Sequence, residues 1–433
     1  MNKKIELKLD QDDMTVGIIG LGYVGLPLAL NFSMASLSVI GFEANKKYIS
    51  MINTGKSYIS HISDEDIKTA RKKGLEATND YKKISKCDFI ILCLPTPLNN
   101  HREPDLSFVI NSMTEILPYL RKGQVISLES TTYPGTTDEI IAPMIEARKF
   151  VIGKDINLIY SPEREDPGNK DFALQSIPKV VGGMTKNCLK AGINLYSKII
   201  DSVVPVSSTR VAEMTKLLEN IHRSVNIGLV NEMKIISDSM DIDINEVITA
   251  ASTKPFGFVP YRPGPGLGGH CIPIDPFYLS WKAKEYGLNA RFIELAGEIN
   301  LNMPNWVINK ITVALNEKKV PISNSRILIL GVAYKKNVSD IRESPSITII
   351  EKLISLHANV SYSDEYVKQI SDLENSSKPL KSKNISPKLL QSFDCVLLAT
   401  DHDNFDYELI KKHSKLIIDT RGIFQKSRKV IQA

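Results

Sequence analysis

A glycine-rich turn between an apolar strand and a helix is the feature that most constrains how this 433-residue chain folds. In the stretch Gly17-Ile-Ile-Gly20-Leu-Gly22-Tyr-Val-Gly25, three glycines occupy the positions of a GxGxxG pattern. Gly20 allows the tight turn, Gly22 lets the backbone approach a pyrophosphate, and Gly25 lets helix and strand pack closely. The helix that follows directs its N-terminus at the phosphate charge. The pattern therefore predicts a dinucleotide-binding turn.

An acidic residue at the end of the next apolar run strengthens this interpretation. Glu43 follows the last glycine by roughly 20 residues, where a carboxylate binds the ribose hydroxyls of a dinucleotide. Because a carboxylate repels a 2′-phosphate, we expect NAD rather than NADP.

Two series of short apolar runs indicate two parallel sheets. The first series comprises MTVGIIGLG, LSVIGFE, CDFIILCLP, GQVISLEST and INLIYSP, and the second SRILILGVAY, ANVSYSDE, DCVLLATDH and KLIIDTRG. Between them, residues 209–240 carry an apolar residue at every third or fourth position, which predicts one helix of roughly 48 Å. These residues are Val211, Met214, Leu218, Ile221, Val225, Leu229, Met233, Ile236 and Met240. A helix of this length commonly joins two domains, and it can also supply a subunit interface.

We therefore predict an α/β fold with two Rossmann-like doubly wound domains, joined by a long central helix and a small helical domain. The expected boundaries are 1–205 for the NAD-binding domain, 206–305 for the central helical domain and 306–433 for the C-terminal α/β domain.

Composition excludes several other classes of protein. The net charge is only +5, with 54 Lys and Arg against 49 Asp and Glu, so we expect neither a nucleic-acid partner nor a membrane partner. The N-terminus has no apolar core of a signal peptide. The 5 cysteines are scattered without metal-ligand spacing, so we expect no metal site and a cytoplasmic location.

One cysteine differs from the other four in its surroundings. Cys271 lies in a Gly/Pro-rich loop, Gly268-Gly-His-Cys-Ile-Pro-Ile-Asp275, whereas the others fit small buried apolar residues. A thiol beside an NAD site suggests aldehyde oxidation through a thiohemiacetal and a thioester. From the residues alone, a structural role for Cys271 stays equally open. His270 is a weak candidate for a base, because adjacent loop residues tend to point apart.

Eight stretches together resemble the nucleotide-sugar 6-dehydrogenase family, which contains the UDP-glucose and UDP-N-acetylhexosamine dehydrogenases. They occur in the family's order: GLGYVGLPLA, LPTPL, ESTTYPGTT, YSPERE, VAEMTKLLEN, PGPGLGGHCIPIDP, GVAYKKNVSDIRESPS and IIDTRG. The resemblance implies oxidation of the C6 hydroxyl of a UDP-sugar to a carboxylate in two steps, with two NAD reduced. It also implies that the C-terminal domain binds the UDP-sugar.

The resemblance assigns roles to residues by position. It implies Cys271 as nucleophile, Lys216 and Asn220 as the pair that stabilises the oxyanion, Glu163 as an acid/base, and Asp275 and Thr131 as residues that position and activate water. For NAD it implies Gly20, Gly22, Tyr23, Val24, Gly25, Glu43, Lys47, Thr96, Thr131 and Arg342. For the UDP-sugar it implies Glu163, Arg164, Lys216, Asn220, Arg262, Gly266, Tyr334, Lys335 and Arg421.

Two departures from the UDP-glucose branch bear on the substrate. Pro167 lies near the position where that branch carries a second Glu, and Lys254 lies roughly where it carries an Arg. The pattern is most similar to the UDP-N-acetylglucosamine branch, with the galactosamine, mannosamine and glucose substrates as alternatives. The resemblance further implies a homodimer and a precursor for capsule, O-antigen or another surface polysaccharide. The alternative functions are a two-electron dehydrogenase of hydroxy acids or phosphosugars and a non-catalytic NAD-binding regulator.

Overall fold

The computed structural model describes residues 14–59, 62–99, 101–164, 174–269, 272–371, 373–374 and 378–433. The chain divides into two compact units, one made of residues 1–219 and 277–288 and the other of residues 220–276 and 289–433. Each unit is described by itself below. The predicted division into three domains stays a prediction.

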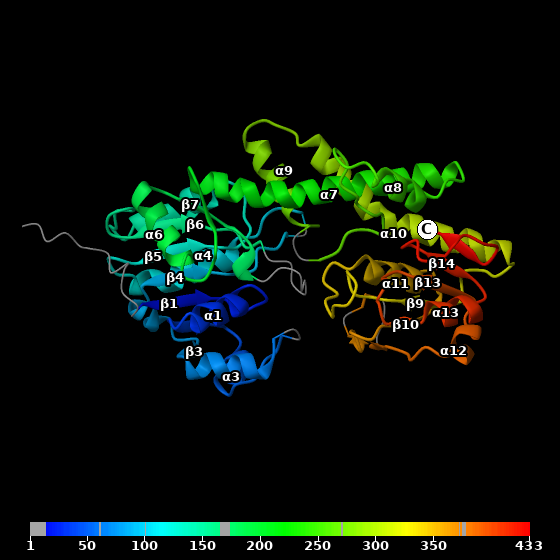
Figure 1. The fold of residues 1–433 in the computed structure, drawn as a ribbon, viewed down its shortest axis with the longest axis horizontal. Helices are drawn as coiled ribbons and strands as arrows, with labels where there is room; N and C mark the ends of the chain where they lie inside the picture. Colours follow the sequence, from blue (N-terminus) through cyan, green and yellow to red (C-terminus); the bar gives the residue numbers. More distant parts are fainter. Residues whose placement is uncertain are drawn as a thin grey trace, which may run out of the picture. The chain divides into compact units, whose positions relative to one another are not determined.

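In the described part of the first unit, eight strands form one sheet in the order β3-β2-β1-β4-β5-β6-β7-β8 (Figure 1). All neighbouring strands are parallel except β6 and β7. The strands are β1 Thr15–Ile19, β2 Ser38–Phe42, β3 Leu75–Thr78, β4 Phe89–Leu92, β5 Val125–Leu128, β6 Asn157–Tyr160, β7 Lys179–Gly183 and β8 Val203–Val206. The predicted apolar runs form β1, β2, β4, β5 and β6, which are buried almost throughout, as parallel strands covered on both faces must be.

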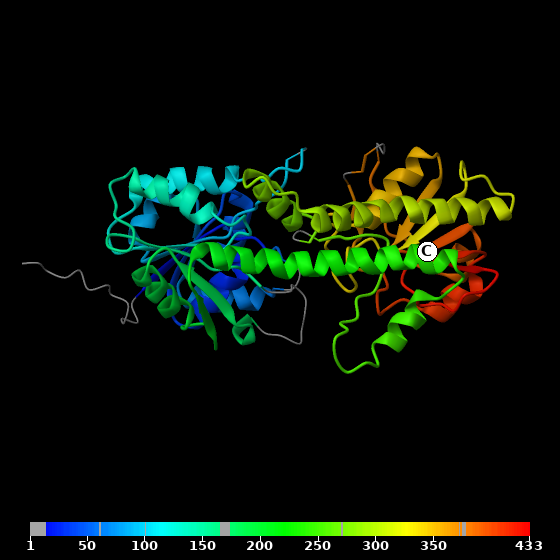
Figure 2. The ribbon, with the colours of Figure 1, turned by 90° about the horizontal axis from the view of Figure 1, so that it is seen from above.

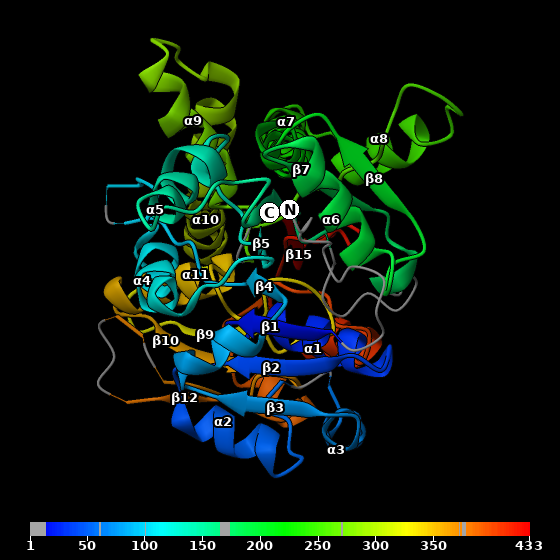
Figure 3. The same ribbon diagram turned by 90° about the vertical axis from the view of Figure 1, so that its left-hand side faces the viewer.

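Helices cover both faces of this sheet (Figure 3). Alternate strand residues belong to the two apolar cores on either side of it. Ile18 and Ile91 belong to the core beneath α1, α3 and α6, whereas Ile19 and Ile90 belong to the core beneath α4 and α5. The helices are α1 Gly25–Met34, α2 Lys46–Asn53, α3 Asp64–Lys72, α4 Ser107–Ile116, α5 Ala142–Glu146 and α6 Lys186–Tyr196, with the short 3-10 helices η1 Tyr81–Lys86, η2 Leu117–Tyr119 and η4 Leu174–Ser176 and the π-helix η3 Thr136–Ile141. This is the doubly wound arrangement that the sequence predicts. Helix α9, Asp275–Glu285, begins in the second unit and continues in the first from Phe277 on.

The predicted long helix is α7, Thr209–Ser239, which is a single helix of 31 residues (Figure 2). Its sides are reversed relative to an ordinary surface helix. Its buried side is polar and carries Thr209, Glu213, Lys216, Asn220, Ser224, Asn231, Lys234 and Ser237, with buried Gly228 between Ser224 and Asn231. Its predicted apolar stripe is exposed at Val211, Met214, Leu218, Leu229, Met233 and Ile236, and the exposure continues at Met240. Ile221 of the stripe is buried at 8% exposure, and Val225 is partly buried.

The second unit contains the second predicted sheet. Over its described residues, five parallel strands run in the order β10-β9-β13-β14-β15 (Figure 1). They are β9 Arg326–Leu330, β10 Asn359–Ser363, β13 Cys395–Leu398, β14 Ile417–Asp419 and β15 Val430–Gln432, and β11 Gln369–Ile370 pairs with β12 Leu380–Lys381. The helices are α8 Ile244–Ala251, α10 Arg291–Glu317, α11 Pro345–Ser355, α12 Pro387–Gln391 and α13 Tyr407–His413. The predicted fold class is therefore confirmed. None of the helices described in either unit is long and apolar enough to cross a membrane.

Candidate active site

The glycine turn after β1 has the geometry that its sequence predicts. Gly20 adopts φ 90°, where glycine is favoured, and its N–H donates to the Phe42 carbonyl oxygen over 2.8 Å. A Cβ atom on Gly25 would lie 1.9 Å from the Gly20 carbonyl oxygen, so α1 can approach β1 only with glycine there. A Cβ on Gly22 would meet no atom within 4 Å, which leaves open space beside the backbone. The turn therefore fits the pyrophosphate of a dinucleotide.

Glu43 is fixed beside this turn. One carboxylate oxygen accepts the Leu21 N–H over 3.2 Å, and the other accepts the Asn45 N–H over 2.9 Å. The carboxylate thus lies directly after β2 and next to the glycine turn, where it can bind ribose hydroxyls. Tyr23 and Lys47 are exposed nearby in sequence.

The other predicted NAD residues are divided between the two units, with Thr96 and Val24 in the first and Arg342 in the second. Thr96 is buried, and its hydroxyl donates to the Thr131 carbonyl oxygen over 2.8 Å, which joins the loops after β4 and β5. Val24 precedes α1. Arg342 belongs to the second unit, where its guanidinium pairs with Asp340.

Glu163 and Arg164 follow directly after β6. The Lys179 ammonium lies 3.3 Å from Glu163 Oε2, and the backbone N–H of Arg164 donates to Glu163 Oε1 over 2.7 Å. Arg164 forms an ion pair of 2.6 Å with Glu219 on α7. The predicted acid/base residue is therefore held by charged contacts at the carboxyl end of its strand.

The buried side of α7 carries the predicted oxyanion pair. Lys216 and Asn220 are one helical turn apart, and both are buried. The Asn220 side-chain N–H donates to Asp275 Oδ2 over 2.5 Å, and Asp275 is buried at the first residue of α9. Two of the predicted site residues, 55 positions apart in sequence, are therefore in direct contact.

The predicted UDP-sugar residues Gly266, Tyr334 and Arg421 lie on loops that pack together in the second unit. A Cβ on Gly268 would lie 2.6 Å from Tyr334 Cβ, and one on Gly264 would lie 2.9 Å from Arg421 Nη1. The Arg421 Nε–H also donates to the Ala399 carbonyl oxygen over 2.7 Å.

Other residues of the predicted set lie on the same loops or near them. The Gly269 N–H donates to the Arg342 carbonyl oxygen over 3.0 Å. The Lys335 ammonium lies over the Tyr334 ring, and exposed Arg262 contacts Thr249. His270, Cys271 and Pro167 lie outside the described residues, so the nucleophile stays a prediction.

Three family models match consecutive parts of the chain. They are the NAD-binding domain (residues 14–200), the central domain (residues 210–302) and the UDP-binding domain (residues 328–426) of the UDP-glucose/GDP-mannose dehydrogenase family. The chain belongs to the UDP-glucose/GDP-mannose dehydrogenase family. It is accordingly an NAD-dependent UDP-sugar dehydrogenase, and the predicted enzyme class and cofactor are confirmed.

Relatives in this family match over nearly their whole length. The chain is 35% identical over 396 residues to a UDP-N-acetyl-D-glucosamine 6-dehydrogenase of Salmonella typhi, covering 91% of both chains. It is 32% identical to a UDP-N-acetyl-D-mannosamine dehydrogenase of Methanococcus maripaludis, covering 96% of this chain and 95% of the relative. A solved UDP-D-ManNAc dehydrogenase of Pyrococcus horikoshii has a TM-score of 0.86 at 29% identity, covering 96% and 97% of the two chains.

Several buried charged residues of this dehydrogenase have no local sequence signal. Glu213 on α7 accepts hydrogen bonds from the backbone N–H groups of Gly135 and Thr137 at 2.7 and 2.9 Å, and burial raises its pKa to about 7. It thereby fixes the start of η3. Lys179 and Glu129 were likewise missed, because their pairing depends on how β5, β6 and β7 are placed in the sheet.

The other cysteines agree largely with the prediction of structural roles. Cys87, Cys188 and Cys395 are buried, whereas Cys93 is only partly buried. Burial raises the pKa of the Cys87 thiol to about 12, which disfavours the reactive thiolate.

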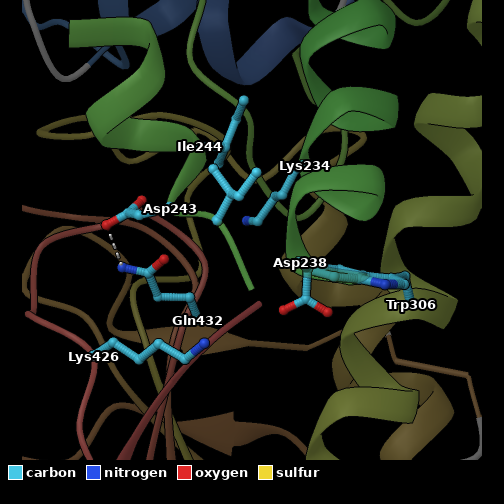
Figure 4. A pocket seen from close by; sticks show the side chains of 8 residues that line it. Lys234, Asp238, Asp243, Ile244, Trp306, Lys426 and Gln432 are labelled. Atoms are coloured by element: carbon cyan, nitrogen blue, oxygen red, sulfur yellow. Dashed lines mark hydrogen bonds between the residues drawn. The ribbon is translucent and has the colours of Figure 1, made fainter. Parts of the chain in front are cut away.

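A cavity of about 20 Å³ in the second unit lies outside the predicted site (Figure 4). It is lined by Lys234, Asp238, Ile242, Asp243, Ile244, Trp306, Lys426 and Gln432. A volume of this size accommodates about one water molecule and no sugar nucleotide.

Proposed function

We propose that this enzyme oxidises the C6 hydroxyl of a UDP-N-acetylhexosamine, UDP-N-acetylglucosamine in the first place, to the uronic acid. The observation that carries the proposal is the buried polar side of α7, where Asn220 contacts Asp275 four residues beyond Cys271. A site that combines an amide, a lysine and a carboxylate with a cysteine nucleophile suits acyl transfer rather than simple alcohol oxidation. The names of the relatives cited above support an N-acetylhexosamine substrate.

The proposed oxidation of the alcohol to the carboxylate proceeds in four steps. The C6 alcohol loses a hydride to NAD and its hydroxyl proton to a base, which yields the aldehyde. The Cys271 thiolate adds to the aldehyde carbon, and Lys216 and Asn220 stabilise the oxygen anion that forms. The resulting thiohemiacetal loses a second hydride to a second NAD, and its hydroxyl proton leaves to give a thioester. Water then attacks the thioester, so that the carboxylate and the free thiol are released.

We assign two groups to take up protons in these steps. Glu163 lies after β6, with Oε2 3.3 Å from the Lys179 ammonium, and is assigned as the base that accepts the hydroxyl proton of the alcohol. Asp275, with Thr131, is assigned to the hydrolytic water, because water attacks a thioester poorly unless a base removes its proton. NAD supplies only the hydride acceptor.

We also propose that the enzyme is a homodimer in which the exposed side of α7 contacts a second copy. Leu218 and Met240 are each 64% exposed, and Leu229 is 54% exposed. Because a row of large apolar side chains along one helix is rare on a monomer surface, a partner surface is expected there. A second copy presents the same row of side chains, and a two-fold axis pairs it with itself.

A cytoplasmic location, with surface polysaccharide synthesis as the use of the product, completes the proposal. UDP-N-acetylgalactosamine, UDP-N-acetylmannosamine and UDP-glucose are the alternative substrates.

The test is the number of NADH molecules formed per molecule of limiting UDP-N-acetylglucosamine, with the three alternative sugars assayed in parallel. Two NADH per sugar and a uronate product are expected. One NADH per sugar refutes the thioester route, and none from any sugar refutes the substrate class.

The nucleophile is tested by Cys271→Ala, with Cys395→Ala as the matched control. The first should form no uronate while NAD still binds, whereas the control should keep two NADH per sugar, because Cys395 is buried in the strand β13. A Cys271→Ala enzyme that forms uronate at the wild-type rate contradicts the assignment.

A further inference from the structure

Three charged side chains form a buried cluster at the carboxyl ends of strands β5 and β6 in the first sheet. The Lys179 ammonium lies 2.8 Å from Glu129 Oε2 and 3.3 Å from Glu163 Oε2. The side chains of Lys179, Glu129 and Glu163 are only 5%, 0% and 13% exposed. One cation is therefore shared by two carboxylates in a region with little water.

The reversed direction of β7 explains how Lys179 comes to lie at the carboxyl ends of β5 and β6. Glu129 and Glu163 follow β5 and β6, which are parallel, so both lie where the strands end. Strand β7 is antiparallel to β6, with Tyr160 opposite Gly182. The start of β7, where Lys179 lies, is therefore beside the carboxyl end of β6. In a parallel strand it would lie beside the amino end of β6.

The two carboxylates differ in their other partners. Glu129 Oε1 accepts the Tyr196 hydroxyl over 2.5 Å, and Tyr196 in turn lies 2.8 Å from the Ser127 hydroxyl. Glu129 is thus a fully buried acceptor for both Tyr196 and Lys179. Glu163 is the outer carboxylate, with its other oxygen 2.7 Å from the Arg164 backbone nitrogen.

We propose that Lys179 and Glu129 are positioning residues that hold the Glu163 carboxylate and set its protonation equilibrium. This rests on the proposed function, in which Glu163 is an acid/base. Lys179 stabilises the ionised form of Glu163. Glu129 competes for Lys179 and repels Glu163, so it weakens that stabilisation. The balance keeps Glu163 able both to accept and to release a proton, as an acid/base must.

The surrounding charges agree with this assignment. Burial lowers the pKa of Lys179, but Glu129 and Glu163 together raise it above its usual value, so the cation persists. Burial raises the pKa of Glu129, and Lys179 opposes that rise. Among the described residues, Tyr196 on α6, the Cys93 thiol after β4, and Arg164 with its partner Glu219 on α7 also face the cluster.

The decisive experiment compares Lys179→Met with Glu129→Gln, because the proposal predicts opposite shifts. Without Lys179, the pKa of Glu163 should rise, and the acidic limb of kcat/KM against pH should move up by about one unit or more. Without the Glu129 charge, Lys179 serves Glu163 alone, and the limb should move down. Lys179→Arg should restore the wild-type position in part.

A second measurement needs no substrate. Infrared difference spectra between each protein and its Glu163→Gln counterpart, recorded across pH, report the protonated carboxyl of Glu163 directly. The same opposite shifts are expected there. If the wild-type enzyme forms no uronate from any UDP-sugar, the proposed function fails, while the infrared titration still decides whether Lys179 and Glu129 control Glu163.

Lys282→Met is the matched control. Lys282 is also a little-exposed lysine, at 6%, and it also bridges two carboxylates, Glu139 and Glu285 at 2.6 and 2.7 Å. Its loss should lower stability without moving the titration of Glu163. If Lys179→Met and Glu129→Gln shift that titration in the same direction, or only lower stability as the control does, the proposal is overturned.

Discussion

Lys234 provides a prediction whose size can be worked out from the structure. Its ammonium lies on the buried side of α7, donates to the Thr420 carbonyl oxygen over 3.2 Å and to that of Ala433, and lies 5.4 Å from the centroid of the Trp306 ring (Figure 4). Burial lowers its pKa from 10.5 to about 7, while nearby charges act in both directions, since Asp419 and Asp238 raise the pKa whereas Arg421 and Lys310 lower it.

The sign of the pH dependence follows from this lowered pKa. Between about pH 7 and pH 10.5 the unfolded chain keeps the Lys234 proton and the folded chain releases it, so the free energy of unfolding rises with pH. The slope is at most about 1.4 kcal/mol per pH unit, up to about 5 kcal/mol over the whole range. Lys234→Met removes this slope and also leaves two carbonyl groups without a donor, at about 1–3 kcal/mol each.

The assay is urea unfolding at a series of pH values, with the fluorescence of Trp306 as the probe of the second unit. The chain has 2 tryptophans, so the other is removed by Trp281→Phe in all proteins compared. The wild-type protein should gain stability over Lys234→Met as the pH rises above 7. Lys318→Met is the control, because Lys318 is an exposed lysine at the end of α10 in the same unit, so the wild-type slope should remain. Curves for wild type and Lys234→Met that stay parallel from about pH 6 to pH 9.5 refute the reasoning.

Three further predictions concern the cofactor and the assembly. Gly25→Ala should lower the melting temperature and abolish NAD binding, because the new Cβ would lie 1.9 Å from a backbone oxygen, whereas Gly22→Ala should keep the melting temperature and still weaken NAD binding at least about tenfold. Calorimetric titration with NAD checks both, and equal effects would contradict the separate roles of the two glycines. Glu43→Gln should reduce the preference for NAD over NADP by about tenfold, measured as the ratio of kcat/KM values, and an unchanged ratio argues against the ribose contact. Leu229→Glu on α7 should yield monomers in light scattering while Leu356→Glu, at an exposed leucine elsewhere, should not; a dimer that survives the first change places the interface elsewhere.

The parts of the fold that follow from local pattern were predictable. Gly20, Gly25 and Glu43 make their contacts with the backbone of the turn and of the neighbouring strand, so a short sequence motif is enough to predict their roles. Apolar runs identify buried strands, but they do not show direction, so the antiparallel placement of β7 and the burial of Lys179 could not be foreseen. Helix α10 is also hard to identify, because Pro304 in its interior is typical of a helix break.

Helix α7 shows a different limit. Its period predicts a helix correctly, yet the apolar side faces outward and the polar side inward. The usual rule assigns the apolar side to the core of the same chain. The contact between Asn220 and Asp275 joins residues 55 positions apart, and the sequence alone suggests it only through family resemblance.

If α7 forms the proposed dimer contact, its reversed sides make catalysis depend on protein concentration. The same 31-residue helix presents Lys216 and Asn220 on one side and the proposed contact with a second copy on the other. When a dilute sample dissociates, water reaches the apolar side, and the helix loses the support that keeps its polar side in register. Specific activity should therefore fall on dilution and recover on concentration, and a crowding agent that favours association should act as an activator without touching the substrate.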